Sequence, residues 1–239
     1  MSYFREFPKE FYQFVNGDTA LMQNLSLYID IVDQVKENSS FYKNYYIRDG
    51  ERPDNVSHKL YENPRLHWTF YLMNDHIREQ GWPLTKTSIV EKAQEDFPNL
   101  TLNTQDDIDM FSKVTTVVSQ SGAKGNLVHI DTSLGQVVID PIDDSEFLSD
   151  DIISDFDGVV TQTASVLSVE DEHLSAHHYV DDEGNITDYR TKDGWNTELF
   201  EMTNLEYYQY RNENLRQIRV IKPSSIATVT SMFGRAVNS

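Results

Sequence analysis

The stretch from Asn44 to Asp75, NYYIRDGERPDNVSHKLYENPRLHWTFYLMND, decides the fold that we expect for this chain. NYYI has the aromatic and β-branched side chains of a short strand, and the DG pair at 49–50 is a turn signal. Pro53 can open a helix at its first turn, and the NP pair at 63–64 ends that helix and can open a second one. The pattern therefore predicts a strand, a turn, a helix, a break and another helix.

The composition around this stretch is that of a folded protein. The chain has 239 residues, of which 38% are hydrophobic, so wholesale disorder is excluded. It has no cysteine, which excludes a disulfide framework, a thiolate metal site and a cysteine nucleophile. It has no run of about 18 apolar residues that could span a membrane, and its first residues lack the apolar run of a signal peptide. We therefore expect a soluble protein, intracellular or part of an assembly, with no membrane partner.

The charge is strongly acidic and unevenly placed. The chain has 20 Lys and Arg against 39 Asp and Glu, a net charge of −19. Residues 104–183 hold 18 acidic and 2 basic residues, whereas the flanks are close to neutral. This balance argues against a nucleic-acid partner, because binding needs basic side chains that displace counterions. The change of composition predicts an acidic module inserted into an otherwise ordinary domain.

The acidic block has the pattern of a β module. LVHID at 127–131 and QVVID at 136–140 predict one hairpin. HHYVDDEGNITDY at 177–189 predicts a second hairpin, and GVVTQTASVLSV at 158–169 predicts a further strand. The stretch 140–157, which carries eight acidic residues and no basic one, predicts a solvated loop.

The two flanks carry the remaining elements. Residues 1–43 are rich in aromatic side chains, and a helix is predicted over 21–38. These aromatics either pack in a core or form an arm that anchors in a partner's pockets, and the sequence favours the two alternatives equally. Near the end of the chain we expect a helix over 197–216, a strand at 218–221 and a last amphipathic helix from Ile226.

Three short motifs suggest chemistry, and a simpler explanation fits each of them better. ISDFDGVVT at 153–161 resembles the first motif of the haloacid-dehalogenase phosphotransferases, but the parallel-sheet pattern that family needs does not follow. His173 and His177, with His178 and Glu172 beside them, could share a metal on a helix, but no third ligand is fixed. The loop 181–185 lacks the glutamate that closes a calcium site. We therefore expect no enzyme, no metal and no cofactor.

Two separate stretches resemble one known family. Residues 45–82 look like the LysM-like segment of the gene product 53 family, the baseplate wedge subunits of T-even-type contractile-tailed phages. The elements that carry this resemblance are Tyr45-Tyr46-Ile47, Arg52-Pro53, Leu60-Tyr61, Asn63-Pro64, Leu66, Trp68, Met73-Asn74-Asp75 and Gly81-Trp82. Residues 212–221, NENLRQIRVI, are similar to the C-terminal segment of that family. The block from about 100 to 175 looks longer than the family's usual middle, so nothing transfers to it.

The resemblance implies a structural virion component of the tail baseplate that is assembled in the host cytoplasm. Its implied partners are other wedge proteins and neighbouring wedges, joined as multiple copies in a ring around the hub. The implied contact residues are Tyr46, Arg52, Pro53, Tyr61, Asn63, Trp68, Asn74, Trp82, Asn212, Glu213, Arg216 and Arg219. For Tyr61 and Trp68, filling the domain's own core stays an alternative, and Glu213 and Arg216 could simply pair with each other. A LysM-type module that binds peptidoglycan or another carbohydrate is the rival function.

The expected fold class is α+β, a LysM-like βααβ core with flanking helices and an inserted small acidic β module. The expected parts are an N-terminal aromatic arm or helix (1–43), the LysM-like core (44–100), the acidic β-rich insert (101–190) and a C-terminal segment of helix and strand (191–239). We expect the C-terminal segment to pack back on the core.

Overall fold

The computed structural model describes residues 9–23, 36, 39–109, 111, 115–142, 146–155, 163–191, 194–196 and 198–237. The chain divides into two compact units. The first is formed by Met1–Thr85 and Asn212–Ser239, and the second is the intervening segment Lys86–Arg211. Helices and strands occur in both units, which confirms the predicted α+β class. The predicted borders of the insert, at residues 101 and 190, lie inside the second unit.

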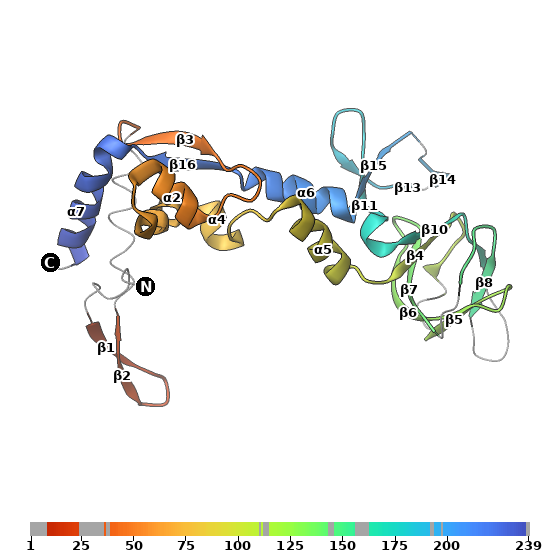
Figure 1. Ribbon diagram of the computed structural model, residues 1–239. Helices are drawn as coiled ribbons and strands as arrows, with labels where there is room; N and C mark the ends of the chain where they lie inside the picture. The colour runs from red at the N-terminus through yellow and green to blue at the C-terminus, as the bar shows by residue number, and fades with distance from the viewer. Residues whose placement is uncertain are drawn as a thin grey trace. The chain divides into compact units, whose positions relative to one another are not determined.

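The first unit is built on two strands that are far apart in the sequence. Strand β3 (Tyr42–Tyr46) pairs antiparallel with β16 (Gln217–Ile221), with Tyr42 opposite Ile221 and Tyr46 opposite Gln217 (Figure 1). The predicted strands at 44–47 and 218–221 are therefore confirmed within one or two residues. The last two residues of β3 belong to the first resembling stretch and β16 belongs to the second, so the two stretches meet in one sheet.

Short helices follow β3 and pack against this sheet. They are α2 (Pro53–Tyr61), the 3-10 turn η2 (Pro64–His67), α3 (Trp68–Met73) and α4 (Asp75–Gln80). Helix α2 begins at Pro53 as predicted, because proline fits the first turn, where no N–H is needed. It ends at Glu62, whose φ of 56° is left-handed. The second predicted helix begins as the 3-10 turn, in which the Asn63 side chain accepts a hydrogen bond from the Arg65 N–H.

The core of the first unit lies between the sheet and these helices. Its buried side chains come from β3 and the loop after it, from α2, α3 and α4, and from the region of β16. They are Ile47, Val56, Phe70, Ile77, Leu215, Ile218 and Val220. The order strand, helix, helix, strand is the one that the sequence predicts, whereas a likeness of this core to LysM domains stays a prediction.

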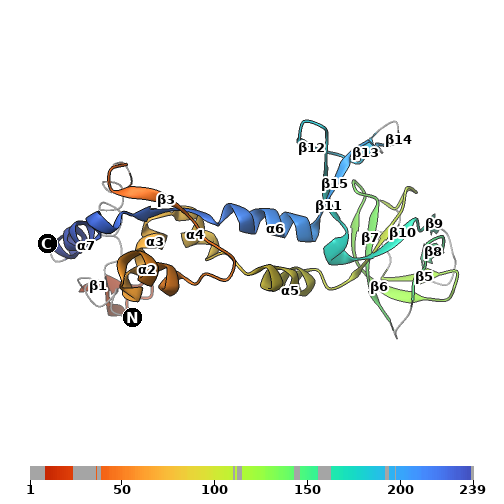
Figure 2. The ribbon, with the colours of Figure 1, turned by 45° about the horizontal axis from the view of Figure 1, so that its top comes forward.

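The second unit holds a curled antiparallel sheet (Figure 2). Its strand order is β10-β4-β7-β6-β5-β8-β9. The strands are β4 (Leu100–Asn103), β5 (Thr116–Ser119), β6 (Lys124–Asp131), β7 (Gln136–Pro141), β8 (Ile152–Asp155), β9 (Thr163–Ser165) and β10 (Ser168–Asp171). The pairing of β6 with β7 confirms the first predicted hairpin.

The connection between the two edge strands closes this sheet into a barrel. In a flat sheet of seven strands the edges would lie roughly 29 Å apart, because neighbouring strands are about 4.8 Å apart. The chain passes from the end of β9 at Ser165 to the start of β10 at Ser168, and such a link spans at most about 11 Å. The sheet must therefore curl on itself. Its interior holds Leu102, Ile108, Phe111, Val117, Ala123, Val137, Ile139, Phe147, Ile153, Ala164 and Val166.

A smaller sheet completes the second unit. It has the order β12-β11-β15, from β11 (Ala176–Val180), β12 (Ile186–Thr187) and β15 (Phe200–Thr203). The pairing of β11 with β12 confirms the second predicted hairpin. The strands β13 (Arg190–Thr191) and β14 (Gly194–Trp195) pair with each other. The helix predicted over 197–216 is wrong at its start, because residues 200–203 pair as a strand with β11.

One helix precedes the barrel in the sequence, and another follows the three-stranded sheet. They are α5 (Lys86–Asp96) and α6 (Asn204–Asn214). The two helices meet where the Tyr208 hydroxyl donates to an Asp96 carboxylate oxygen at 2.9 Å. The Tyr208 ring also lies edge-on to Phe97, with ring centroids 5.6 Å apart.

The two ends of the chain form a hairpin and a helix. Strands β1 (Lys9–Gln13) and β2 (Thr19–Gln23) pair antiparallel, and α7 (Ile226–Val237) is the predicted last helix. The helix predicted over 21–38 is wrong at residues 21–23, which belong to β2, and residues 24–35 lie outside the described ones. Among the helices of the described residues, none has both the length and the apolar character needed to cross a membrane.

Candidate functional site

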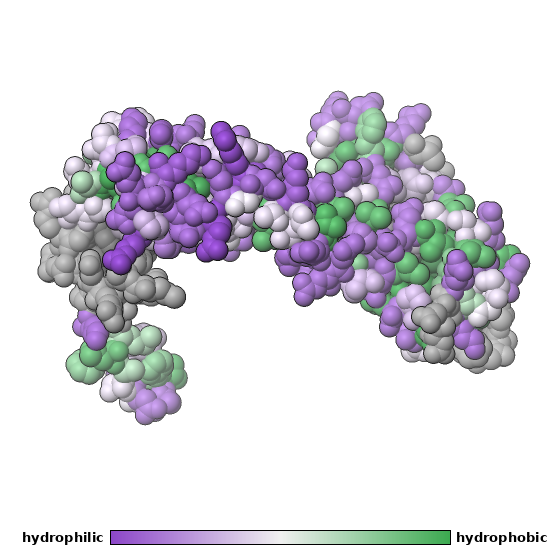
Figure 3. Space-filling model, in the orientation of Figure 1, coloured by the Kyte–Doolittle hydropathy of each residue, from purple (hydrophilic) through white to green (hydrophobic). Residues whose placement is uncertain are grey.

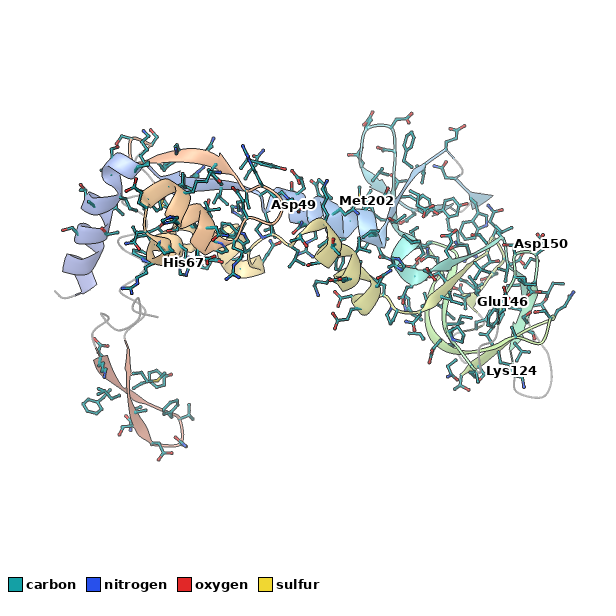
Figure 4. The ribbon with its side chains drawn as sticks, viewed as in Figure 1. Asp49, His67, Lys124, Glu146, Asp150 and Met202 are labelled. Atoms are coloured by element: carbon teal, nitrogen blue, oxygen red, sulfur yellow. The ribbon has the colours of Figure 1, made fainter. Side chains whose placement is uncertain are left out.

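Arg216 is one of three predicted contact residues that are buried among polar groups, together with Asn74 and Asn212. Its side chain is 6% exposed and lies beside Asp49 in the loop after β3, which Figure 4 labels. Nη1 donates to the Ile47 carbonyl at 3.3 Å, and Nη2 donates to Asp49 Oδ1 at 3.0 Å and to the Leu84 carbonyl at 3.1 Å. Nε lies 3.3 Å from Glu213 Oε2, so the pairing expected from their spacing is present. One guanidinium thus ties three backbone segments of the first unit together.

Two buried asparagines hold backbone groups of the same unit. Asn74 Oδ1 accepts from the Arg219 N–H at 2.7 Å, and Asn74 Nδ2 donates to the carbonyls of Arg219 and Phe70, both at 2.8 Å. Asn212 Oδ1 accepts from the Leu84 N–H at 2.7 Å, and its Nδ2 donates to the Leu84 carbonyl at 3.1 Å. Each amide side chain therefore forms the two hydrogen bonds that a neighbouring strand would otherwise form, because it offers an acceptor to the N–H and a donor to the carbonyl of one residue.

The aromatic residues of the resemblance line the core. The Tyr61 hydroxyl donates to the Ile221 carbonyl at 2.9 Å, and burial raises the pKa of Tyr61 to about 12. Trp82 Nε1 donates to the Glu51 carbonyl, and the Trp82 ring packs 5.9 Å from Phe70 between centroids. Tyr61 therefore packs against the core of the first unit, which is the alternative role that the sequence left open. Trp68 is half-buried at the start of α3.

The remaining predicted residues lie at the surface of the first unit. Arg52 has a side chain that is 75% exposed and pairs with Asp54 at 3.2 Å, and Pro53 follows it at the start of α2. The exposed Tyr46 donates its hydroxyl to Glu213. Arg219 projects from β16 over the ring of Tyr42, with 5.1 Å from Cζ to the centroid. These exposed groups are available to a partner, whereas Arg216, Asn74 and Asn212 are engaged inside the unit.

A pocket of about 700 Å³ opens beside these surface residues. Its lining includes Tyr46, Asn74, Asp75, His76 and Arg219. The Lys36 ammonium reaches both Asp75 carboxylate oxygens at 2.8 Å on its rim. His76 Nε2 is buried and has no hydrogen-bond partner in the part of the chain that the structure describes. The pocket therefore offers the polar groups of Asp75 and Arg219 and the ring of Tyr46 to a hydroxyl-rich or peptide ligand.

The N-terminal hairpin presents apolar side chains on both of its faces. Phe11 is paired with Leu21 on one face, and these side chains are 80% and 53% exposed. Tyr12 and Met22 lie on the other face, and they are also exposed. A lone two-stranded hairpin is only marginally stable in water. The hairpin is therefore an exposed apolar surface of the described residues that binding to a partner would stabilise.

The net negative charge of the chain is carried by one of its two units. Residues 86–211 carry 7 Lys and Arg against 26 Asp and Glu, so the second unit holds the whole net charge of −19. The first unit has 13 residues of each sign. A basic partner would therefore be attracted to the second unit and not to the first.

The groups that suggested chemistry do not gather into a site. Within the described part of the chain, no three His, Asp or Glu side chains stand close enough to hold a metal ion. His177 and His178 lie on β11 with Nδ1 atoms 2.8 Å apart, and His177 stacks on Tyr207 with centroids 4.0 Å apart. His173 is buried in a 3-10 turn, so the predicted helical spacing of the histidines is wrong. In the phosphotransferase-like motif, residues 156–161 lie outside the described ones.

Sequence reasoning missed the hairpin, although a signal for it was present. The dipeptide Asn16-Gly17 favours tight turns between strands. Gly17 has a φ of 88°, which glycine adopts without a steric penalty. The flanking runs KEFYQ and TALMQ do not alternate between polar and apolar residues, so the usual pattern of a half-buried strand is missing.

Comparison with known proteins gives a match to a class of phage structural proteins. Residues 7–113, a little under half of the chain, match the model of a family of tail baseplate components. The family is described as base plate wedge protein 53, so this part of the chain is similar to that family. A search of curated proteins gives no match. The second resembling stretch, 212–221, lies beyond the matched residues and its resemblance stays a prediction.

Proposed function

We propose that this protein is a structural component of a phage tail baseplate wedge that binds other wedge subunits and joins adjacent wedges around the hub. The family match supports a structural role in a phage baseplate, and with it a place in the virion. The observation that carries the finer proposal is the N-terminal hairpin, because it lies within the matched residues and its apolar side chains are exposed.

The two faces of the hairpin suit a protein that joins two neighbours. Phe11 and Leu21 would bury their side chains against one surface, and Tyr12 and Met22 against another. Aromatic anchors contribute most of the binding energy at protein interfaces. A hairpin that is sandwiched in this way would also gain the stability that it lacks alone. The polar framework of Arg216 would keep the rest of the first unit folded before assembly.

Complementation of a phage that lacks this chain tests the proposal. Variants F11S and L21S should assemble into particles poorly, because each removes an anchor from the same face. Their unfolding in isolation should match that of the wild type, since both side chains are already exposed in the free chain. Variant K9S, on the same face, is the control and should assemble normally. Full assembly with either anchor removed would contradict the proposed role of the hairpin.

Carbohydrate binding is a second candidate, and the pocket of the first unit favours it. Tyr46 supplies an aromatic ring, and Asp75 and Arg219 supply polar groups around about 700 Å³. Sugars are commonly held by such a mixture of ring and polar contacts. Retention of the purified chain on peptidoglycan or chitin would support this function, and loss of retention in H76A would place it in the pocket. Free passage through both matrices would eliminate it.

A further inference from the structure

The three-stranded sheet of the second unit has an open apolar row at one end. Val180 on β11 lies opposite Ile186 on β12 and opposite Phe200 on β15. Side chains that are directly opposite in a sheet point to the same face. Ile186 is 74% exposed and Phe200 is 60% exposed. We call Phe200, Val180 and Ile186 the apolar row.

The other face of this sheet is already covered. Tyr179, the neighbour of Val180 on β11, stacks on Tyr189 with centroids 4.4 Å apart, and Tyr189 meets Trp195 at 5.1 Å. On the face of the apolar row, His178 lies opposite Met202, which Figure 4 labels on β15. The His178 ring meets Tyr207 of α6 edge-on at 5.9 Å. The open area is therefore confined to the end of the sheet that carries the apolar row.

Acidic residues surround the apolar row in the chain. Asp181, Asp182 and Glu183 form the turn between β11 and β12, and Glu198 precedes β15 by two residues. Figure 3 shows green, hydrophobic surface amid purple, hydrophilic surface on the lobe that contains these strands. An apolar centre with a charged rim is the usual layout of a protein-binding surface. The sign of the rim specifies the partner, because the complementary rim must be basic.

We propose that the apolar row docks another protein of the same particle, one that presents an apolar ridge flanked by Lys and Arg. This inference rests on the proposed function, because that function supplies the particle. A second copy of this chain does not fit, since two such surfaces would bring acidic rims together on units that each carry −19. The row thus gives the acidic second unit a partner-binding role separate from that of the hairpin.

Hydroxyl-radical footprinting of purified particles and of the isolated chain tests the inference. Oxidation of Phe200 and Ile186 should fall several-fold in the particle, because a docked partner would exclude water from both. A chain that is present in the particle with both residues as reactive as in isolation would overturn the inference and leave the proposed function standing. Absence of the chain from the particle would overturn both. Protection in the isolated chain that disappears on dilution would assign the surface to a second copy and overturn the inference.

A variant series separates docking from folding. F200S and I186T should leave the circular dichroism of the free chain unchanged, because both side chains are exposed. Both variants should release the second unit in the particle, seen as faster hydrogen exchange in β11. V128T, which changes a side chain on β6 that is 53% exposed, is the matched control and should behave as the wild type. Raising the salt from about 0.1 M to about 1 M shortens the screening length from roughly 10 Å to roughly 3 Å, so protection should weaken. Protection that is indifferent to salt and to F200S would overturn the proposal.

Discussion

Removal of Arg216 should destabilise the first unit far more than removal of an exposed predicted contact residue. Arg216→Ala deletes the side-chain donor to the Ile47 carbonyl and one of the two donors to the Leu84 carbonyl, which keeps its hydrogen bond from Asn212. A buried acceptor that loses its partner costs about 1–3 kcal/mol, whereas the exposed carboxylates of Asp49 and Glu213 regain water. We therefore expect a loss of about 3 kcal/mol. For a unit of roughly 110 residues this corresponds to a fall of about 10 °C in melting temperature.

Arg52→Ala is the matched control, because the same resemblance implies both arginines as contacts. The Arg52 side chain is 75% exposed and its single ion pair with Asp54 lies in water, so its loss should cost less than about 0.5 kcal/mol. Arg216→Lys keeps the charge but cannot reach several acceptors as a planar fork does, and we expect an intermediate loss.

Hydrogen exchange of peptides that cover β3 and β16 is the suitable assay, because a chain of two units need not unfold in one transition. Exchange in these strands should speed up strongly in Arg216→Ala and stay unchanged in Arg52→Ala. Peptides from the barrel should not respond to either change. Equal protection of β3 in wild type and Arg216→Ala would refute the assignment of Arg216 as a framework residue.

Three further predictions concern stability. Gly135→Ala should destabilise the second unit by about 2 kcal/mol or more in a urea titration, because φ is +70° and a Cβ would lie 2.3 Å from the Thr104 carbonyl oxygen. The control Gly122→Ala, where φ is +97° and the added Cβ would meet open space, should cost about 1 kcal/mol. Burial alone would raise the pKa of Glu51, but hydrogen bonds from the Arg48 N–H and from the Lys59 and Tyr45 side chains outweigh it and lower the pKa below 4.5. The stability that this carboxylate provides is therefore complete above pH 4.5 and lost as pH falls through the folded pKa, and Glu51→Gln should flatten this acid limb in chemical denaturation across pH. Burial, with the charges of Glu170 and Glu206 nearby, raises the pKa of Glu201. The second unit should therefore lose stability as pH rises through that pKa, and Glu201→Gln should raise the urea midpoint at neutral pH. An unchanged or lower midpoint would show that the repulsion is absent.

Local signals in the sequence predicted the elements of the first unit well. Pro53 and the pair Asn63-Pro64 act through backbone geometry alone, so their effects on helix ends could be read without knowing the fold. The pairing register of β3 and β16 could not be predicted in this way, because several registers would place apolar residues on the same face and the two strands are far apart in the sequence. The sequence did indicate that the last segment returns to the core.

The closure of the barrel and the roles of the site residues lay beyond local patterns. Two residues, Val166 and Leu167, separate β9 from β10. This short link indicates a closed sheet only when the strand order shows that β9 and β10 are the two edge strands. Similarly, Asn74, Asn212 and Arg216 are polar residues of a kind that suits an interface, yet each is buried and satisfied by backbone groups of the first unit. A pattern of residue types shows that a polar group is needed, whereas only the fold shows whether it faces a neighbour or a carbonyl of the same chain.

A chain that joins wedges must be built into the tail baseplate and be needed there. Mass spectrometry and electron microscopy can check both requirements on particles from wild-type phage and from a phage whose gene for this chain is interrupted. We expect wild-type baseplates to contain the chain in a fixed ratio to the other wedge proteins, and the interrupted phage to accumulate wedges that do not close into a ring. Complete, infectious tails that lack the chain would contradict the account.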